Sequence, residues 1–192
     1  MADSLRRRLS LEEFLAWEER QESRNEFVDG DIRVMVGGTR RHNQVAANIL
    51  THLIQRLRGA KCQPYGEGMK ILVPAGNVRY GDVTVDCGPM KDDDIAATAP
   101  CVVVEVLSKS TAFLDQSQKL DDYQSIPSMR HILHLSQERP EGELWTRDAG
   151  GWRRASLSGV DAMVDLTAIG VSFALAAAYE GINFDEEGAV AT

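Results

Sequence analysis

The sequence predicts a mixed α/β fold in which helices flank a partly antiparallel β-sheet. Three patterns predict it. Residues 41–58 carry an apolar stripe at helical spacing, residues 101–107 form an almost continuous apolar run, and turn signals of hairpins lie near both ends of the chain. A strand that is apolar throughout is typical of burial on both faces. Such segments build a layered domain around a central sheet.

The first third of the chain predicts a helix, a hairpin and a second helix. Ser10 with Glu13 three residues later is a capping-box pattern, which marks the start of a helix. Asp29-Gly30 is a strong hairpin turn signal, and Gly59 follows the last residues of the apolar stripe, where helices commonly end. The predicted elements are a helix over 10–20, hairpin strands over 26–28 and 32–35, and a helix over 41–58.

The rest of the chain predicts mainly strands. The apolar run is followed by helical spacing that stops before Pro127, since the residue before a proline is disfavoured in a helix. A second hairpin is predicted around residues 148–151, where an Asp and two Gly favour a turn. In order, the predicted elements are strands over 69–73, 78–87 and 101–107, a helix over 111–125, a strand over 129–136, hairpin strands over 143–147 and 152–155, and a short apolar helix over 171–182.

Length and composition favour one globular domain. We expect the 192 residues to form a single domain, residues 1–192, with an ordered core over about 10–184 and flexible ends. The chain is 43% hydrophobic and 26% charged, which excludes a largely disordered protein. Its net charge of −8 argues against a protein that coats nucleic acid in bulk, because such binding needs many Lys and Arg side chains on phosphates. Local basic patches remain, at the arginines of residues 6–8 and at Arg40 and Arg41.

The cysteines and the N-terminus favour a cytoplasmic protein. Cys62, Cys87 and Cys101 are odd in number and show no CxxC spacing, so we expect free thiols in a reducing cytosol rather than a disulfide scaffold or a zinc site. Polar residues follow the early arginines at once, which argues against a signal peptide. No apolar run approaches the ~20 residues of a membrane helix, so no membrane partner is expected.

Glu105 is the most informative residue, because it interrupts the apolar run. Along a strand it shares a face with Val103 and Leu107. A carboxylate in such a setting costs several kcal/mol unless it is paired or binds a metal. A Glu at an exposed strand end, or one paired with a neighbouring cation, is the structural alternative. A functional carboxylate is the interpretation that we favour.

A second carboxylate lies in the predicted strand before it. Asp82, Thr84 and Asp86 alternate with apolar residues and so share one polar face. An ordinary half-solvated strand would show the same pattern. If the carboxylates of Asp82 and Glu105 converge from neighbouring strands, they form a hard-oxygen site suited to Mg²⁺ or Mn²⁺.

Lys119 is the candidate cation beside these carboxylates. On the predicted helix over 111–125 it shares a face with Leu120 and Tyr123, the apolar residues that should meet the sheet. The alternative is a solvated ion pair with Asp115, four residues earlier, worth ~0.3–0.5 kcal/mol. Lys109 follows the buried strand, but the sequence does not indicate its direction.

Three histidines bear on the site. His42 lies at the start of the apolar stripe over residues 41–58, and a histidine there is either a hydrogen-bonded residue at the core edge or a ligand. His131 and His134 are three residues apart on a predicted strand. They therefore face opposite ways and do not form a joint metal site.

Together these residues resemble a known family. An Asp at a strand start, an apolar strand that holds Glu-Val-Leu-Ser, and a helix with Asp, Lys and Tyr are similar to the PD-(D/E)XK nuclease superfamily. The resemblance is closer to the bacterial Uma-two family of restriction-endonuclease-like proteins, and it runs from about residue 10 to residue 184. The stretches that carry it are 25–31, His42, 80–83 and 103–111, continuing through Asp115, Lys119 and Tyr123 to 126–128.

The resemblance implies a restriction-endonuclease-like core and hydrolysis of DNA phosphodiester bonds that depends on Mg²⁺ or Mn²⁺. It implies that Asp82 and Glu105 are catalytic and hold the metal, and that Lys119 is the third catalytic residue. The accessory residues implied are Glu26 as an outer metal ligand, His42 as a phosphate contact and Tyr123 as a support for Lys119, and the implied DNA contacts are Arg40 and Arg41.

Three features depart from the family pattern. The family tends to carry an aromatic residue in the strand after the helix, where this chain has Ile132-Leu133-His134. The family usually has Pro before the Asp, where this chain has Gly81. The superfamily has a Lys two residues after the Glu, where this chain has Leu107. In this family a lysine on the following helix replaces it, and the corresponding residue here is Lys119.

Two other functions fit the same sequence. One is a catalytically inactive nuclease-fold protein that binds DNA or a protein partner, since a fold does not fix a function. The other is a metal-dependent hydrolase of small phosphoesters. We also expect a homodimer, because residues 173–179 form an apolar tail, three tryptophans lie in a small domain, and cutting both strands of a duplex favours two sites.

Overall fold

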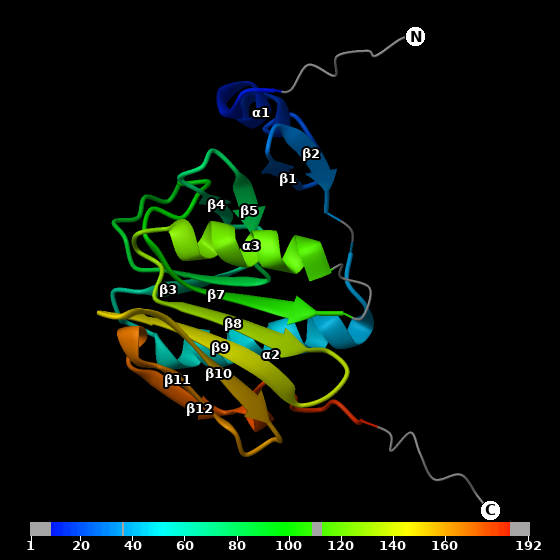
Figure 1. Ribbon diagram of the computed structural model, residues 1–192, viewed down its shortest axis with the longest axis vertical. Coiled ribbons are helices and arrows are strands. Elements are labelled where there is room, and N and C mark those ends of the chain that lie inside the picture. Colours follow the sequence, from blue (N-terminus) through cyan, green and yellow to red (C-terminus); the bar gives the residue numbers. More distant parts are fainter. Residues whose placement is uncertain (1–8, 36, 109–112, 185–192) are drawn as a thin grey trace, which may run out of the picture.

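A six-stranded mixed sheet is the centre of the computed structural model (Figure 1). In the order β10-β9-β8-β7-β6-β3, only β7 and β8 are parallel neighbours. The structure describes residues 9–35, 37–108 and 113–184, without the side chains of residues 113–115; the ends expected to be flexible lie outside these ranges. The strands are β3 (Gln63–Gly66), β6 (Val83–Asp86), β7 (Pro100–Leu107), β8 (His131–Ser136), β9 (Glu141–Asp148) and β10 (Gly151–Ser158).

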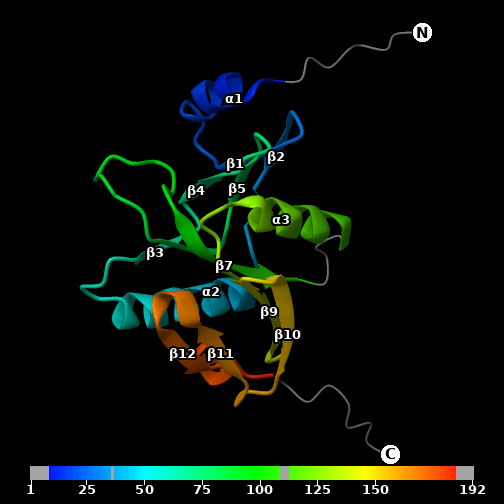
Figure 2. The ribbon, with the colours of Figure 1, turned by 60° about the vertical axis from the view of Figure 1, so that its left-hand side comes forward.

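Helices cover both faces of this sheet, which confirms the predicted fold class. α3 (Phe113–Ser125) connects β7 to β8 and lies on one face, and α2 (Arg40–Arg56) lies on the other (Figure 2). The predicted buried strand is β7, whose residues 100–106 are all buried. The apolar stripe of α2, with Val45 and Ile49, packs against β6 and β7. Among the described residues, no helix combines the length and the apolar character that a membrane span requires.

A smaller sheet holds the N-terminal part of the chain. Its strands follow the order β2-β1-β5-β4, and α1 (Leu11–Glu18) packs on it through a cluster that includes Phe14, Phe27 and Tyr80. The capping box of Ser10 and Glu13 is present, as predicted. The strands are β1 (Asn25–Val28), β2 (Asp31–Val34), β4 (Lys70–Leu72) and β5 (Val78–Tyr80).

The strand predicted over residues 78–87 is two strands in two different sheets. β5 ends at Tyr80 in the smaller sheet, and β6 begins at Val83 in the main sheet. Gly81 and Asp82 form the break between them. The sequence hides this break because both strands are buried and the apolar residues continue through them. The candidate ligand Asp82 therefore lies where the chain passes from one sheet to the other.

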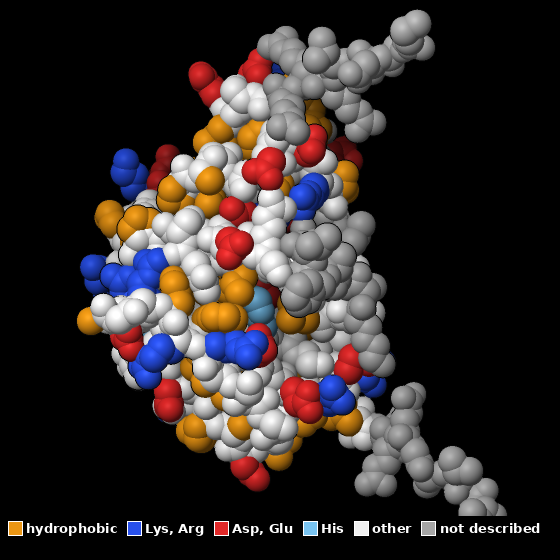
Figure 3. Space-filling model, viewed as in Figure 1, with side chains coloured by type: hydrophobic (Ala, Val, Ile, Leu, Met, Phe, Trp, Pro, Cys, Tyr) orange, Lys and Arg blue, Asp and Glu red, His pale blue; other side chains and the backbone are white. Residues whose placement is uncertain are grey.

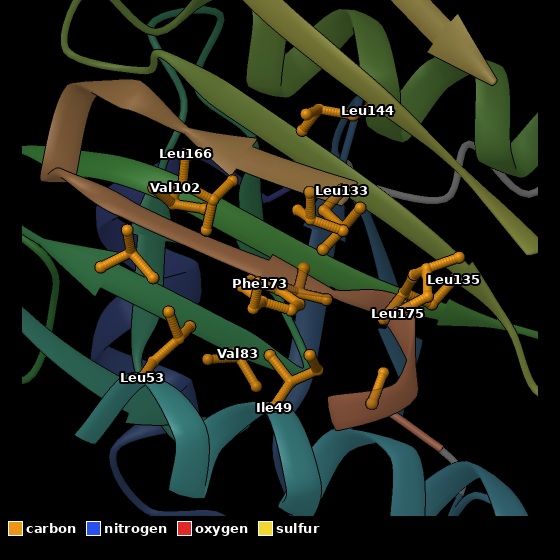
Figure 4. Packing of buried hydrophobic residues seen from close by; sticks show 14 of the residues in the cluster. Ile49, Leu53, Val83, Val102, Leu133, Leu135, Leu144, Leu166, Phe173 and Leu175 are labelled. Carbon is orange, nitrogen blue, oxygen red and sulfur yellow. The ribbon is translucent and has the colours of Figure 1, made fainter. Parts of the chain in front are cut away.

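The apolar tail is a strand followed by a short 3₁₀ helix, so the helix predicted over residues 171–182 is wrong. β11 (Met163–Leu166) and β12 (Val171–Ala174) form a hairpin, and Leu175–Ala177 form the 3₁₀ helix. Gly170 adopts the left-handed conformation, with φ 66°, that the turn into β12 requires. Figure 4 shows side chains of this hairpin, of α2 and of the main sheet meeting in one core.

The large apolar side chains at residues 173, 175 and 179 of the tail are not exposed to a second copy of the chain. Phe173, Leu175 and Tyr179 are at most 5% exposed in the molecule's own core. The hydroxyl of Tyr179 also donates hydrogen bonds to the carbonyls of Ser136 and Glu141. The homodimer thus loses the tail as its main support and stays a prediction.

The expectation of three free thiols is wrong, because Cys62 and Cys87 form a disulfide. β3 was not predicted, since Pro and Gly make up half of its four residues. It pairs antiparallel with β6, with Gln63 opposite Asp86, and one step further along this register Cys62 lies opposite Cys87. The pairing comes from sheet topology, which spacing along the chain does not reveal. Cys101 is a free, buried cysteine.

Candidate active site

Glu105 lies near the end of β7, on the sheet face that α3 covers. Two residues earlier, Val103 packs in one cluster with Tyr123 of α3 and Ile132 of β8, so the alternation of the strand directs Glu105 to the same face. Only 8% of Glu105 is exposed. The position is that of a carboxylate which must be paired to be tolerated.

Two side chains of α3 pair with Glu105. The hydroxyl of Tyr123 donates a 2.6 Å hydrogen bond to Oε1. Nζ of Lys119 lies 3.0 Å from Oε1 and 3.1 Å from Oε2. The predicted inward direction of Lys119 is thus confirmed. The alternative partner, the side chain of Asp115, and the second candidate, Lys109, lie outside the described residues.

Burial sets the protonation of this group of side chains. It raises the pKa of Glu105 to about 7, with the charge of Asp82 adding to the effect, while Lys119 and the Tyr123 hydrogen bond oppose it. Burial also disfavours the charge on Lys119, but the carboxylates of Glu105 and Glu26 outweigh this and raise its pKa above the usual range. Lys119 is therefore a fixed positive charge between Glu105 and Glu26.

Asp82 faces Glu105 across the end of the β6–β7 ladder. The last paired residues are Val83 and Val104, and one step further Asp82 stands opposite Glu105. Oδ2 of Asp82 accepts a 2.7 Å hydrogen bond from the backbone N–H of Val106. This bond ties the side chain of Asp82 to the peptide that follows Glu105, so the two carboxylates belong to one rigid unit.

His42 is the partner of Asp82 from α2. Its Nε2 lies 3.3 Å from Oδ2 of Asp82. The hydrogen bond that His42 donates to Asp82 raises the pKa of His42; burial opposes this, and the charges of Asp82 and Glu105 add to it. His42 is therefore the hydrogen-bonded residue at the core edge that the sequence left as one alternative, and it also belongs to the site.

Asp86, the second acid of the same predicted strand, has a structural role. Its carboxylate accepts hydrogen bonds from the backbone N–H groups of Gly88, Thr98 and Ala99. It holds the loop between β6 and β7 and is only 2% exposed. Oδ1 of Asp82, in contrast, accepts no hydrogen bond from the described residues.

Glu26 brings a third carboxylate to the site from β1 of the smaller sheet. Its Oε1 lies 3.1 Å from Nζ of Lys119, and its Oε2 accepts a 2.9 Å hydrogen bond from Nη1 of Arg79. Burial raises the pKa of Glu26, but Lys119 and Arg79 outweigh it and lower the pKa. Glu26 thus shares Lys119 with Glu105 and stays charged.

Arg79 and Asp122 join the smaller sheet to α3, and neither was identified from the sequence. Arg79 is fully buried, and its Nε donates a 2.7 Å hydrogen bond to Oδ2 of Asp122. Asn77 donates to the same carboxylate. A buried Arg between two carboxylates fixes the distance between β5 and α3, and so the position of Lys119 relative to Glu26.

The β9–β10 hairpin holds the C-terminal end of α3. Arg147 donates hydrogen bonds to the carbonyls of Gln124 and Ile126, where α3 ends, and its guanidinium lies over the ring of Trp152. Nε1 of Trp152 donates to the same carbonyl of Gln124. A cation at the C-terminus of a helix also interacts favourably with the helix dipole. The position of α3 is therefore set at several points along its length.

Arg40 and Arg41 are the first two residues of α2 and directly precede His42. With Gln44 and Gln137 they line a cavity of about 520 Å³. Arg41 lies 3.8 Å from Glu138, and its guanidinium also lies over the ring of Phe184. The two arginines are thus near the site, whereas the arginines of residues 6–8 lie outside the described residues.

His131 and His134 face opposite ways, as predicted. His131 faces the β11–β12 side, where Nε2 accepts a hydrogen bond from the backbone N–H of Ala168. Nδ1 therefore carries the proton and donates to Oγ1 of Thr146. Burial, with the charge of Arg130, lowers the pKa of His131 to about 4, so it is a neutral structural residue. His134 is aligned with Glu105 on the α3 face.

The donor set fits a divalent cation of the Mg²⁺ type. Two carboxylates, Asp82 and Glu105, supply hard oxygen ligands, and one oxygen of Asp82 is open. Among the described residues there is no group of three His, Cys, Asp or Glu side chains that could hold a metal ion. Mg²⁺ commonly binds through one or two carboxylates and completes its shell with water and substrate phosphates. The site has the ligands for this mode and lacks those for a closed structural metal site.

Gly81 leaves room for Val103 at the break before Asp82. A Cβ at position 81 would lie 2.4 Å from Cγ2 of Val103. Gly81→Ala is therefore expected to destabilise the protein by about 1–3 kcal/mol. Shortening the neighbour in the double variant Gly81→Ala/Val103→Ala removes the clash, with a coupling energy of about 1–2 kcal/mol. Urea unfolding of the four proteins measures this energy, and strictly additive effects would contradict the contact.

The fold and the matched family define the class of protein. The crystal structure of a putative nuclease belonging to DUF820 from Anabaena variabilis superimposes with a TM-score of 0.72 at 13% identity, covering 88% of this chain and 97% of that one. The fold is therefore that of a restriction-endonuclease-like protein. Residues 11–178 match the Uma2 family, described as "Putative restriction endonuclease". The chain belongs to the Uma2 family, as the sequence resemblance indicated.

Two relatives from Synechocystis sp. are similar over most of their length. Uncharacterized protein slr1290 is 35% identical over 180 residues, which cover 92% of this chain and 94% of the relative. Uncharacterized protein sll1609 is 29% identical over 133 residues, which cover 67% of this chain and 75% of the relative. Neither description states an activity.

Proposed function

We propose that this protein is a metal-dependent endonuclease that hydrolyses DNA phosphodiester bonds. The observation that carries the proposal is the meeting of Asp82, Glu105 and Lys119 at the end of β7. Two carboxylates from adjacent strands and one fixed cation form a set that suits phosphodiester hydrolysis, because the reaction needs a metal and positive charge near the phosphate. Membership of the Uma2 family supports the same class of reaction.

Each residue of the site has a proposed role. Asp82 and Glu105 would hold Mg²⁺ or Mn²⁺, which when bound polarises the phosphate and lowers the pKa of a coordinated water. Lys119 orients the attacking water or stabilises the developing negative charge. Tyr123 fixes one oxygen of Glu105, and His42 fixes one oxygen of Asp82.

Glu26 and the two arginines complete the proposal. Glu26 acts by holding Lys119 in place. This role differs from the outer metal ligand that the sequence suggested. Arg40 and Arg41 would contact DNA phosphates beside the cleft. Acidic and basic side chains are mixed over the face that carries α3 (Figure 3), so local positive charge and the bound metal must offset the net charge of −8.

Cleavage of supercoiled plasmid DNA tests the proposal. The purified protein should nick or linearise the plasmid with Mg²⁺ or Mn²⁺ and should be inactive with EDTA. Binding of DNA without cleavage under every divalent metal would favour the non-catalytic alternative. Turnover of a chromogenic phosphodiester without any cleavage of DNA would favour a hydrolase of small phosphoesters.

A further inference from the structure

A row of polar side chains crosses the main sheet on its α3 face. Asp82 stands opposite Glu105, Glu105 is aligned with His134 of β8, and His134 pairs with Glu143 of β9. Residues aligned across neighbouring strands share a face and lie roughly 5 Å apart. His134 is therefore the next side chain to Glu105, on the side away from Asp82.

His134 is buried, yet its ring has no partner among the described residues. Only 7% of the residue is exposed. Neither ring nitrogen makes a hydrogen bond or an ion pair with any residue in the part of the chain that the structure describes. Neither nitrogen belongs to the fully buried unpaired atoms of the described residues, so both are open to a ligand.

Every polar neighbour of His134 in this row is already bound. Glu105 accepts from Tyr123 and Lys119. Glu143 accepts a 3.1 Å hydrogen bond from Nη1 of Arg154. The imidazole of His134 thus lies beside the proposed reaction centre, and its ring nitrogens are free to bind a ligand.

The surroundings of the ring favour an anionic ligand. Glu105 and Glu143 flank the ring, but each is paired with a cation, Glu105 with Lys119 and Glu143 with Arg154. The charge of Lys119 also acts on His134 itself. A cation bound at the ring would be repelled by this ammonium, whereas a phosphate oxygen would be attracted by it. An imidazole carries at least one N–H in either protonation state, so it can donate to such an oxygen at any pH.

We propose that His134 donates a hydrogen bond to a phosphate oxygen of the DNA strand bound beside Glu105 and Lys119, and is a further residue of the active site. This inference rests on the proposed function, because the phosphate is that of its substrate. His134 acts together with Lys119 on the phosphate, while Asp82 and Glu105 act on the metal.

Substitution of His134 tests the inference. His134→Phe keeps a ring of similar size and removes the donor. It should lower the single-turnover rate of DNA cleavage about 10- to 100-fold, as expected for a lost hydrogen bond to a charged group. Mn²⁺ affinity, measured by calorimetry, should stay within about twofold of the wild type, since the two carboxylates remain. His134→Gln, which keeps a donor, should recover part of the rate, and this recovery would not be expected if the ring served only in packing.

His52→Phe is the matched control. His52 lies on α2, where its ring packs on Phe173 in the other core, and it is remote from the row of polar side chains. This variant should cleave at the wild-type rate. If His134→Phe also cleaves at the wild-type rate, or if His134→Gln is as slow as His134→Phe, the inference is wrong and the proposed function stands.

A second readout separates the inference from the proposed function. The ¹⁵N signals of the His134 ring are followed while a short DNA duplex is added with Ca²⁺ in place of Mg²⁺, so that cleavage is not needed. A shift of these signals is the expected result, and the signals are identified by their absence from the spectrum of His134→Phe. If the wild type cleaves no DNA but the ring signals shift, the endonuclease proposal fails and the phosphate contact holds; unchanged ring signals overturn the contact.

Discussion

Lys119→Met should lower the rate of DNA cleavage by about 10²–10³-fold, because it removes the fixed positive charge beside Glu105. The methionine keeps the length of the side chain and its packing on α3. Metal binding should persist, since an ammonium is not a metal ligand and the carboxylates of Asp82 and Glu105 remain. Single-turnover cleavage and Mn²⁺ titration, measured on the same preparation, give the two quantities.

The control for this variant must separate charge from stability. Lys119 lies between Glu105 and Glu26, and its removal leaves two buried carboxylates without their shared cation. Breaking such a pair typically costs about 3–5 kcal/mol. Adding Glu26→Gln to Lys119→Met removes one of the two negative charges that Lys119 balanced. Because Arg79 still pairs with Glu26 in the single variant, the second substitution should restore only part of the thermal stability, without restoring cleavage. Wild-type cleavage by Lys119→Met would reduce Lys119 to a structural counter-ion.

Asp82→Asn should abolish metal binding and cleavage together. The amide oxygen can still accept the hydrogen bond from the N–H of Val106, so the fold of the β6–β7 end is kept. One of the two anionic ligands is lost, however, and a bound metal is worth several kcal/mol of transition-state stabilisation. We expect a loss of at least about 100-fold in cleavage rate. Calorimetry should show that the affinity for Mn²⁺ falls with it.

Asp86→Asn is the matched control for Asp82→Asn. Both residues belong to the same stretch of chain, but Asp86 is bound to the N–H groups of the following loop. Its substitution should lower the midpoint of thermal unfolding and leave Mn²⁺ affinity unchanged. A metal affinity that depends on Asp86 and not on Asp82 would place the metal elsewhere and contradict the proposed site.

The elements predicted correctly are those whose signal is local. The capping box of Ser10 and Glu13 fixes the start of α1, and the helical stripe and the apolar run identify α2 and β7. The tail failed because an apolar stretch of this length fits a short helix or a buried strand equally well, and burial against the main sheet decided it. The prediction of free thiols at Cys62 and Cys87 was wrong because strand pairing, which spacing along the chain does not reveal, brings the two residues together.

The core of the candidate site could be predicted for a physical reason. A carboxylate inside an apolar strand is costly, and this cost draws attention to Glu105, while helical spacing directs Lys119 towards it. The supporting residues give no such signal. In the sequence, nothing distinguishes Arg79, Asp122 and Arg147 from ordinary surface charges. Only the packing of the smaller sheet on α3 makes Arg79 and Asp122 buried partners, and only the β9–β10 hairpin brings Arg147 to the end of α3.

Placing the lysine on a helix has a consequence for recognising other proteins of this kind. When the lysine lies two residues after the Glu, the two residues form one short sequence motif, which a pattern search detects directly. Here that position is Leu107. The ammonium comes instead from Lys119 of α3, fourteen residues after Glu105. The strand and the helix can then vary separately, as long as the helix keeps its place. Related proteins with divergent sequences are therefore better sought by the spatial arrangement of two carboxylates and an ammonium than by a linear sequence motif.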